Sequence, residues 1–463
     1  MPARIRILLA AAVVVVAAWA GAAYAARVTP DSFLAGRPTV SINVASLVGP
    51  GDPDRRVIET AYEQVQHAYY QPFDPQRLLD GESKALTAYL KSKQVAGPGV
   101  GSLRSTGDSA RDLALIEHTV DTIAGRYPKI ATKSVFTEVA VTGMLGGLGD
   151  PYTTYLSANE IRSLDEQLKG GNFGGIGVYI VQDPKTGTIL VDPIEGNPAI
   201  RAGVRTGDAI VAVDNHATTG QKLDEVEREI RGPKGTVVSL RVRRHTGQQL
   251  QTIAITRADV HVPSVRAKIE DGISYVRLAD FGSTSAEEIR NALLAAKQKG
   301  VHGYILDLRN NGGGLLDAAV DISSLVVPSG PIVSTIDRAG HRDVRSATGQ
   351  PVGASPMVVL VNKYTASASE ITAGALQDYH LATIVGTKTF GKGVVQSLYQ
   401  LPDQGALKIT TARYVTPLGR DIQHKGIVPD VVVDQRVDAP IIDTPADVQL
   451  TAAKSIIRKK DLQ

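Results

Sequence analysis

Three hydroxyl side chains lie within five positions of the segment YTASASEI: Thr365, Ser367 and Ser369, with Glu370 directly after them. The order Ser-x-x-Glu is that of a capping box, in which a serine and a glutamate satisfy the first amides of a helix. The same position suits a nucleophile, because a serine at a strand-to-helix turn points its oxygen out of the sheet. On this segment alone, the pattern favours the helix cap over catalysis.

A second segment, DLRNNGGG, places three consecutive glycines after an apolar run. Glycines allow a backbone to approach another group closely or to expose its N–H groups. A plain glycine-rich turn would explain the segment equally well. Asp307 and Arg309 are expected to hold this turn by hydrogen bonds rather than to act in catalysis.

A third segment, TFGKGVVQ, places Lys392 between two glycines and Gln396 four residues later. Along a strand, these two side chains would point the same way. A lysine between glycines is usually a solvated turn residue, so Lys392 gains interest only if the fold brings it to Ser367. The nine histidines show no metal-ligand spacing, and the absence of cysteine excludes thiolate catalysis and Cys-based metal sites. We therefore expect neither a metal nor a cofactor.

The elements that must position these segments alternate from residue 270 onward. The pattern predicts strands at ISYVRL, HGYILDLR, PMVVLVN and LATIVG, and helices at SAEEIRNALLAAKQKG, GLLDAAVDISSLVV and SASEITAGALQDY. Such alternation indicates a parallel sheet with right-handed crossovers. Ligands of these sheets bind beyond the carboxyl ends of the strands. The turns at 309–314 and 363–367 lie at such ends, so we expect any chemistry there.

The N-terminus and the composition bear on location and partners. An uncharged run of 20 residues, Ile7–Ala26, follows a short basic start, and as a helix it would be about 30 Å long, enough to cross a bilayer core. Ala23-Tyr24-Ala25 has the form of a signal-peptidase site. A cleaved signal and an uncleaved anchor both remain open, and either predicts an extracytoplasmic protein, periplasmic or in the cell envelope. The net charge of +3 on 463 residues gives no argument for nucleic acid.

Seven segments together resemble the C-terminal-processing (tail-specific) protease family, serine peptidases with a Ser-Lys dyad. They occur in the family's order from about residue 140 to 435: DPYTTYL, GNFGGIGVYI, GVRTGDAIVAVD, DLRNNGGGLLDAAV, NKYTASASEITAGALQD, GTKTFGKGVVQ and YVTPLGRDIQHKGIVPDVVV. The resemblance implies that Ser367 is the nucleophile, with Lys392 and Gln396 as its catalytic partners. It implies that the amides of Gly313 and Ala368 form the oxyanion hole.

The resemblance also implies a PDZ domain inserted before the catalytic core. The sequence GGIG, formed by Gly174, Gly175, Ile176 and Gly177, stands where PDZ domains keep their carboxylate-binding loop. Successive N–H groups there would hold a terminal carboxylate while the peptide adds as a strand to the sheet edge. An ordinary glycine turn would explain GGIG alone, but the PDZ-like AGVRTGDAIVAVDN downstream favours the domain. The implied partners are protein or peptide substrates with apolar C-termini.

The implied fold class is α/β: a crotonase/ClpP-like parallel-sheet protease core with an inserted β-rich PDZ domain and a helical N-terminal region. The expected division is a signal or anchor (1–26), a linker (27–54), a helical region (55–165), a PDZ domain (166–258), the core (259–437) and a C-terminal helical tail (438–463). Homo-oligomers are possible, as is membrane attachment through an uncleaved N-terminus.

No histidine is placed to activate Ser367, so Lys392 must be the base of the expected endopeptidase. A lysine accepts a proton only when neutral, and its reference pKa of about 10.4 must be lowered by burial. Gln396 could orient the amine by a hydrogen bond. A non-catalytic PDZ adaptor, or a binding protein on the same fold, is the alternative. Such a non-catalytic protein would not need Ser367, Lys392, Gln396 and the glycine turn together.

Overall fold

The computed structural model describes residues 52–168, 173–183, 186–194, 196–244, 249–260, 262–434, 442 and 446–461. The predicted signal or anchor segment, Ile7–Ala26, lies outside the described residues. Among the described helices, none is long and apolar enough to cross a membrane.

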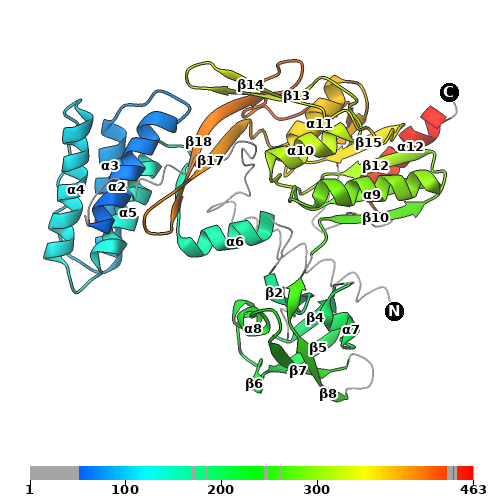
Figure 1. Ribbon diagram of the computed structural model, residues 1–463, viewed down its shortest axis with the longest axis horizontal. Coiled ribbons are helices and arrows are strands. Elements are labelled where there is room, and N and C mark those ends of the chain that lie inside the picture. The colour runs from blue at the N-terminus through cyan, green and yellow to red at the C-terminus, as the bar shows by residue number, and fades with distance from the viewer. Residues whose placement is uncertain are drawn as a thin grey trace.

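The part of the N-terminal region that the structure describes is a bundle of four helices, which agrees with the expected helical region (Figure 1). The helices are α2 (Pro53–Ala68), α3 (Gln76–Ser92), α4 (Ser109–Arg126) and α5 (Lys133–Gly147). Helices α3 and α5 pack through glycines, since a Cβ atom added at Gly143 would lie 2.6 Å from the Gly81 carbonyl oxygen. After the bundle, β1 (Thr154–Leu156) and α6 (Ala158–Leu168) lead to a separate β-rich module.

This module is β-rich, as expected, and also contains a short and a longer helix. Its elements are β2 (Phe173–Gly175), β3 (Val178–Gln182), β4 (Ile189–Pro193), α7 (Pro198–Arg201), β5 (Asp208–Val213), β6 (His216–Ala217), α8 (Leu223–Ile230), β7 (Val237–Arg243), β8 (Leu250–Thr256) and β9 (Ala258–Val260). The strand order β3-β4-β5-β7-β8 leaves β3 at one edge of the sheet, and β2 pairs with β9. An edge strand has unpaired backbone groups that can accept another strand.

The predicted parallel sheet is present, with the strand order β10-β11-β12-β15-β16-β19. Its strands are β10 (Val265–Glu270), β11 (Ile273–Leu278), β12 (Gly303–Asp307), β15 (Met357–Val361), β16 (Thr383–Gly386) and β19 (Val431–Val432). All pairings are parallel except that of β10 with β11. The helices are α9 (Ser285–Gln298), α10 (Leu316–Ser324), α11 (Ala368–Asp378) and α12 (Val448–Asp461). The two polar turns therefore lie at the carboxyl ends of the adjacent strands β12 and β15, as predicted.

A second sheet, which the sequence did not predict, joins the helical bundle to the parallel sheet (Figure 1). It is formed by β1, β13 (Pro331–Asp337), β14 (Arg342–Ser346), β17 (Val394–Gln400) and β18 (Ala406–Val415). Strand β18 contributes Leu407 and Ile409 to the core of the helical bundle. It contributes Ala412 and Tyr414 to the core beside the parallel sheet. One strand thus belongs to two hydrophobic cores.

Candidate active site

Ser367 lies at the turn between β15 and α11 in a backbone conformation that non-glycine residues rarely adopt, with φ 56° and ψ −120°. Such strain persists where the surrounding structure holds it, and serine nucleophiles at strand-to-helix turns are an example. The Ser367 N–H donates to Glu370 Oε2 at 3.0 Å. This is the glutamate half of the predicted capping box, so the cap and the strained turn share the same residues.

Glu370 connects the serine turn to the lysine loop. Its buried carboxylate accepts hydrogen bonds from the Lys392 N–H at 2.9 Å, from the Gly391 N–H at 2.7 Å and from the Thr389 hydroxyl. Burial raises the pKa of Glu370, and these hydrogen bonds oppose that shift. The sequence pattern identified Glu370 only as a cap, because its second set of partners lies about 20 residues further along the chain.

Tyr414 on β18 forms a second connection between the two segments. Its hydroxyl oxygen lies 2.6 Å from the Lys392 carbonyl oxygen and 3.1 Å from the Ser367 carbonyl oxygen. The single hydroxyl proton donates chiefly to the nearer oxygen. Glu370 and Tyr414 together hold the backbones of Ser367 and Lys392 side by side, although 25 residues separate them in the chain. The fold therefore brings the backbone of Lys392 next to that of Ser367, as a role for Lys392 at the serine requires.

The Lys392 side chain is 1% exposed, and its amine lies over the Tyr152 ring, 4.7 Å from the ring centroid. Burial lowers the pKa of Lys392 well below its usual value, and the nearby positive charge of Lys408 lowers it further. Burial also raises the pKa of Tyr152 to about 12, which keeps the phenol neutral. Tyr152, which belongs to the segment DPYTTYL, thus contacts the predicted base, a role that the sequence pattern did not indicate.

The predicted hydrogen bond between Gln396 and Lys392 is not present in this structure. Gln396 is buried on β17, and its Nε2 donates to Thr410 Oγ1 at 3.2 Å. Its Oε1 accepts no hydrogen bond from any described residue. The expectation assumed one continuous strand, but β17 begins at Val394, and its register with β18 shifts just before Gln396. A register shift of this kind re-aims the side chains beside it.

Gly313 lies against Ser367, as the close-approach interpretation of the triple glycine predicts. A Cβ atom added at Gly313 would lie 2.8 Å from Ser367 Cβ and 2.8 Å from the Ala368 nitrogen, and φ is 101°. The Gly313 N–H donates to Asn311 Oδ1 at 2.8 Å, so this amide is occupied in the structure. Ser367 itself is 0% exposed. Peptide access to Ser367 therefore requires the surrounding residues to move.

Asp307 and Arg309 hold the glycine turn, as expected. The Arg309 Nη2 donates to Asp307 Oδ2 at 2.6 Å and to Asp447 Oδ2 at 2.8 Å, and all three side chains are buried. The Tyr275 hydroxyl donates to Asp307 Oδ2 at 2.7 Å. Asp447, the residue before α12, thus holds Arg309 at the start of the glycine turn.

The GGIG loop precedes the edge strand β3 in the β-rich module. Gly174 and Gly175 pair with β9, so they belong to a ladder. The Ile176 and Gly177 carbonyls accept hydrogen bonds from Ala199 and Ile194, whereas the amides of these two residues have no backbone acceptor among the described residues. Gly177 has φ 73°. The two amides are therefore the part of the loop that can hold a carboxylate.

Apolar side chains lie on the two elements that follow this loop and pack against it. Val178 and Ile180 of β3, together with Leu223 of α8, are partly buried against the core of the module. A peptide added as a strand to β3 would place alternate side chains between β3 and α8.

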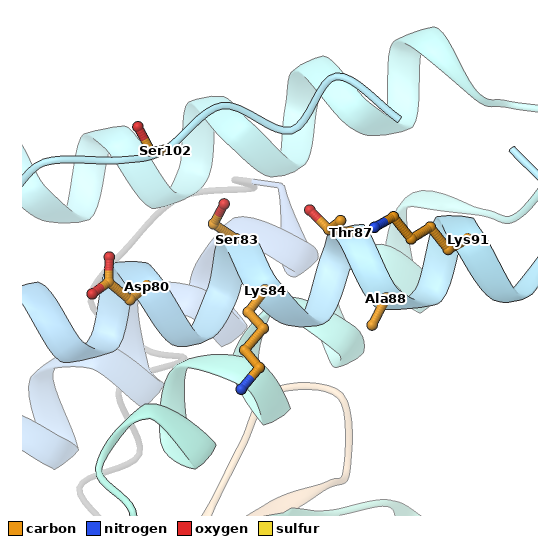
Figure 2. Close-up of a pocket in the computed structure, with 7 residues that line it drawn as sticks. All are labelled: Asp80, Ser83, Lys84, Thr87, Ala88, Lys91 and Ser102. Atoms are coloured by element: carbon orange, nitrogen blue, oxygen red, sulfur yellow. The ribbon is translucent and has the colours of Figure 1, made fainter. Parts of the chain in front are cut away.

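A surface groove that none of these residues lines is present on α3 (Figure 2). It has a volume of about 360 Å³ and is lined by polar side chains, with Asp80, Ser83 and Thr87 directed toward Ser102. No predicted site residue lines it. Among the described residues, no group of three His, Asp or Glu side chains is placed to hold a metal ion.

Comparison with known proteins identifies the family. A solved photosystem II D1 C-terminal processing protease aligns with 88% of this chain and 97% of its own, at 29% identity and a TM-score of 0.47. A carboxy-terminal-processing protease of Bartonella bacilliformis is 38% identical over 331 residues, which cover 70% of this chain and 76% of the relative.

A carboxyl-terminal-processing protease of Synechocystis sp. is 40% identical over 328 residues, which cover 69% of this chain and 77% of the relative. Residues 189–244 match the PDZ domain, and residues 272–433 match peptidase family S41. The chain therefore belongs to peptidase family S41 and is a serine peptidase that carries a PDZ domain.

Proposed function

We propose that this chain is an extracytoplasmic endopeptidase that recognises the C-terminal tail of protein substrates through its PDZ domain and cleaves them with a Ser-Lys dyad. One observation carries the proposal: Glu370 and Tyr414 each bind the backbones of both Ser367 and Lys392. This arrangement holds a strained serine beside a buried lysine whose pKa is lowered.

In the acylation step, one proton moves from Ser367 to the departing amine by way of Lys392, and the scissile C–N bond is replaced by a bond to Ser367 Oγ. The neutral Lys392 amine takes the Ser367 hydroxyl proton while Oγ forms a bond to the carbonyl carbon of the scissile peptide. The carbonyl oxygen becomes negative in the tetrahedral intermediate. The Lys392 ammonium then gives its proton to the departing amine, and the acyl group stays on Ser367.

Deacylation repeats these steps with water as the nucleophile, and it releases the new carboxyl terminus. The proposed oxyanion donors are the amides of Ala368 and Gly313. Because Asn311 Oδ1 occupies the Gly313 amide, the proposal requires that this hydrogen bond opens before the oxyanion forms. Substrate binding also has to uncover Ser367.

The dyad is tested by the pH-dependent reaction of Ser367 with a fluorophosphonate and by casein hydrolysis. Ser367→Ala should abolish both activities while the fold is retained, since a lost helix cap costs about 1 kcal/mol. Lys392→Arg should be inactive because a guanidinium stays protonated. The exposed Lys388→Arg is the matched control and should keep parental activity. Inactivation by Ser369→Ala, with Ser367→Ala nearly unaffected, would show that the nucleophile is misassigned.

Tail recognition is tested with paired peptides that differ only in their C-terminus. The Ile176 and Gly177 amides would bind a free carboxylate, and amidation removes the charge that they hold. Binding of an apolar tail to the full chain should weaken markedly when it is amidated. Equal cleavage of amidated and free-acid peptides would remove the PDZ domain from substrate recognition.

Location is tested by mass analysis of the protein from cells. An N-terminus at Ala26 would indicate signal cleavage, and an intact Met1 in the membrane fraction would indicate an anchor. Recovery from the cytosol would contradict the proposed location. A PDZ adaptor without catalysis, the alternative, would bind peptides but would not react with the fluorophosphonate.

A further inference from the structure

Lys408 is a second buried lysine at the site, and the proposed mechanism does not use it. It lies on β18 and is 2% exposed. Strand side chains alternate between faces, so Lys408 shares its face with Thr410 two residues on. Thr410 Oγ1 is the acceptor for Gln396 Nε2 at 3.2 Å. The same strand face therefore carries both Lys408 and the residue that holds Gln396.

Strand β1 brings Lys408 close to the ring that contacts Lys392. Thr154 of β1 pairs directly with Lys408. The preceding residue, Thr153, accepts a hydrogen bond from the Thr410 N–H at 3.0 Å, and Tyr152 comes just before it. Lys408 thus lies beside the turn whose aromatic ring contacts the Lys392 amine.

Two carboxylates favour the charged form of Lys408. Burial lowers the pKa of Lys408 to about 8, and the carboxylates of Asp150 and Glu160 oppose that shift. Asp150 is held in place, because it accepts hydrogen bonds from the Tyr152 N–H at 3.0 Å and from Thr153 Oγ1 at 2.7 Å. Lys408 therefore carries a positive charge at neutral pH. The positive charge in turn disfavours a second charge on Lys392.

We propose that Lys408 is a positioning residue of the proteolytic site, whose charge acts on the amine of Lys392. The inference rests on the proposed function. Lys408 does not touch the reacting atoms in this account. Because the two amines repel each other, the first proton to leave the pair comes from Lys392, which is the more deeply buried of the two. A neutral base is thereby available while Lys408 remains charged.

Other titratable groups face this pair from the elements packed against it. They are Asp150 and Tyr152 before β1, Glu160 on α6, Glu370 on α11 and Tyr414 on β18. Burial raises the pKa of each of these tyrosines, so they stay neutral in the range where a lowered lysine titrates. A pH shift that depends on residue 408 is therefore not the titration of one of these tyrosines.

The test measures the rate constant for reaction of Ser367 with a fluorophosphonate in the full chain, from about pH 5 to about pH 10. Lys408→Met should move the acid limb of this profile to higher pH by about one unit, which is about a tenfold loss of rate below the limb. Lys408→Arg keeps the charge and should restore the parental limb. An unshifted limb in Lys408→Met would overturn the inference, as would an equal shift in Lys408→Arg.

Two further measurements keep the test decisive. If Lys408→Met does not fold, as judged by circular dichroism, Lys408→Gln replaces it, and the same two outcomes apply. Ser367→Ala and Lys392→Met report on the proposed function alone. If both stay as reactive as the parent, the proposed function fails. If both are unreactive and the limb of the Lys408 variant is unshifted, only the role of Lys408 fails.

Discussion

Replacing Glu370 by glutamine or alanine should separate the two tasks of this carboxylate. Its Oε2 accepts the Ser367 and Lys392 amides, and its Oε1 accepts the Gly391 amide and the Thr389 hydroxyl. Glutamine keeps one oxygen. The best orientation turns that oxygen to the first pair and the NH₂ group to the second, because a hydroxyl can also accept a hydrogen bond.

Glu370→Gln then leaves one buried donor unsatisfied, the Gly391 N–H, at a cost of about 1–3 kcal/mol. Glu370→Ala leaves three buried backbone donors without an acceptor, at a cost of about 3–9 kcal/mol, which is comparable to the stability of a whole domain. Glutamine should therefore give a folded protein with a loosened Lys392 loop. Its reaction with the fluorophosphonate should fall about tenfold to a hundredfold. Alanine should unfold the catalytic core.

Hydrogen exchange of the α11 amides measures this effect within the core and avoids treating a chain of several domains as one cooperative unit. Glu225 on α8 is the matched control, because it is also a third helical residue that accepts its cap amide, from Lys222 at 2.9 Å, but at an exposed position. Glu225→Gln and Glu225→Ala should cost about 1 kcal/mol or less. Glu370 variants that exchange and react like the Glu225 variants would refute the bridging role.

Three further outcomes are expected. Glu82 is buried in α3, neither carboxylate oxygen has a hydrogen-bond partner among the described residues, and burial raises its pKa well above its usual value. The protonated Glu82 side chain is tolerated in the core, so the protein has its full stability below the pKa of Glu82 in the unfolded chain. That stability is lost as pH rises through the raised pKa of Glu82 in the folded protein. Glu82→Met should therefore raise the melting temperature more at about pH 8 than at about pH 4. Asp447→Asn should lower stability by about 3–5 kcal/mol in urea unfolding, because it removes one of two buried carboxylates from Arg309. Gln396→Ala should lower peptide hydrolysis less than Lys392→Arg does, because Gln396 contacts Thr410 rather than the amine.

Each of these outcomes has a control. Glu63→Met on an exposed position of α2 should change the melting temperature equally at both pH values, and an equal change for Glu82→Met would contradict the burial argument. Asp271→Asn removes the exposed partner of Arg458 and should cost about 1 kcal/mol or less. A similar small loss for Asp447→Asn would show that the buried network adds little. Full activity of Gln396→Ala would exclude it from the site.

Local patterns predicted the elements whose residues lie close together in the chain. The alternation of strands and helices after residue 270 predicted the parallel sheet, and the polar turns predicted where the site lies. The serine, the lysine and the glycine turn were identified from their own segments and the family resemblance. Each prediction needed only periodicity, turn chemistry or a short motif.

Contacts between distant segments could not be predicted in this way. The second sheet pairs strands from residue 154 to residue 415, and its strands show no pattern that specifies their partners. The roles of Tyr152 and Tyr414 depend on that sheet, since it brings both to Lys392. The predicted direction of the Gln396 side chain was wrong for a related reason. The register between β17 and β18 shifts beside Gln396, and no single segment reveals that shift.

Strand β18 limits how this enzyme can be shortened for experiments. The segment that matches the peptidase family, 272–433, contains β18 but not the helical bundle. In such a fragment, Leu401, Leu407 and Ile409 would lose the helices that cover them and form an apolar surface in water. Exposed surfaces of this kind cause aggregation. We therefore expect that soluble protein for crystallisation or screening requires the bundle from residue 53 onward, and that removing the PDZ module is tolerated better than removing the bundle.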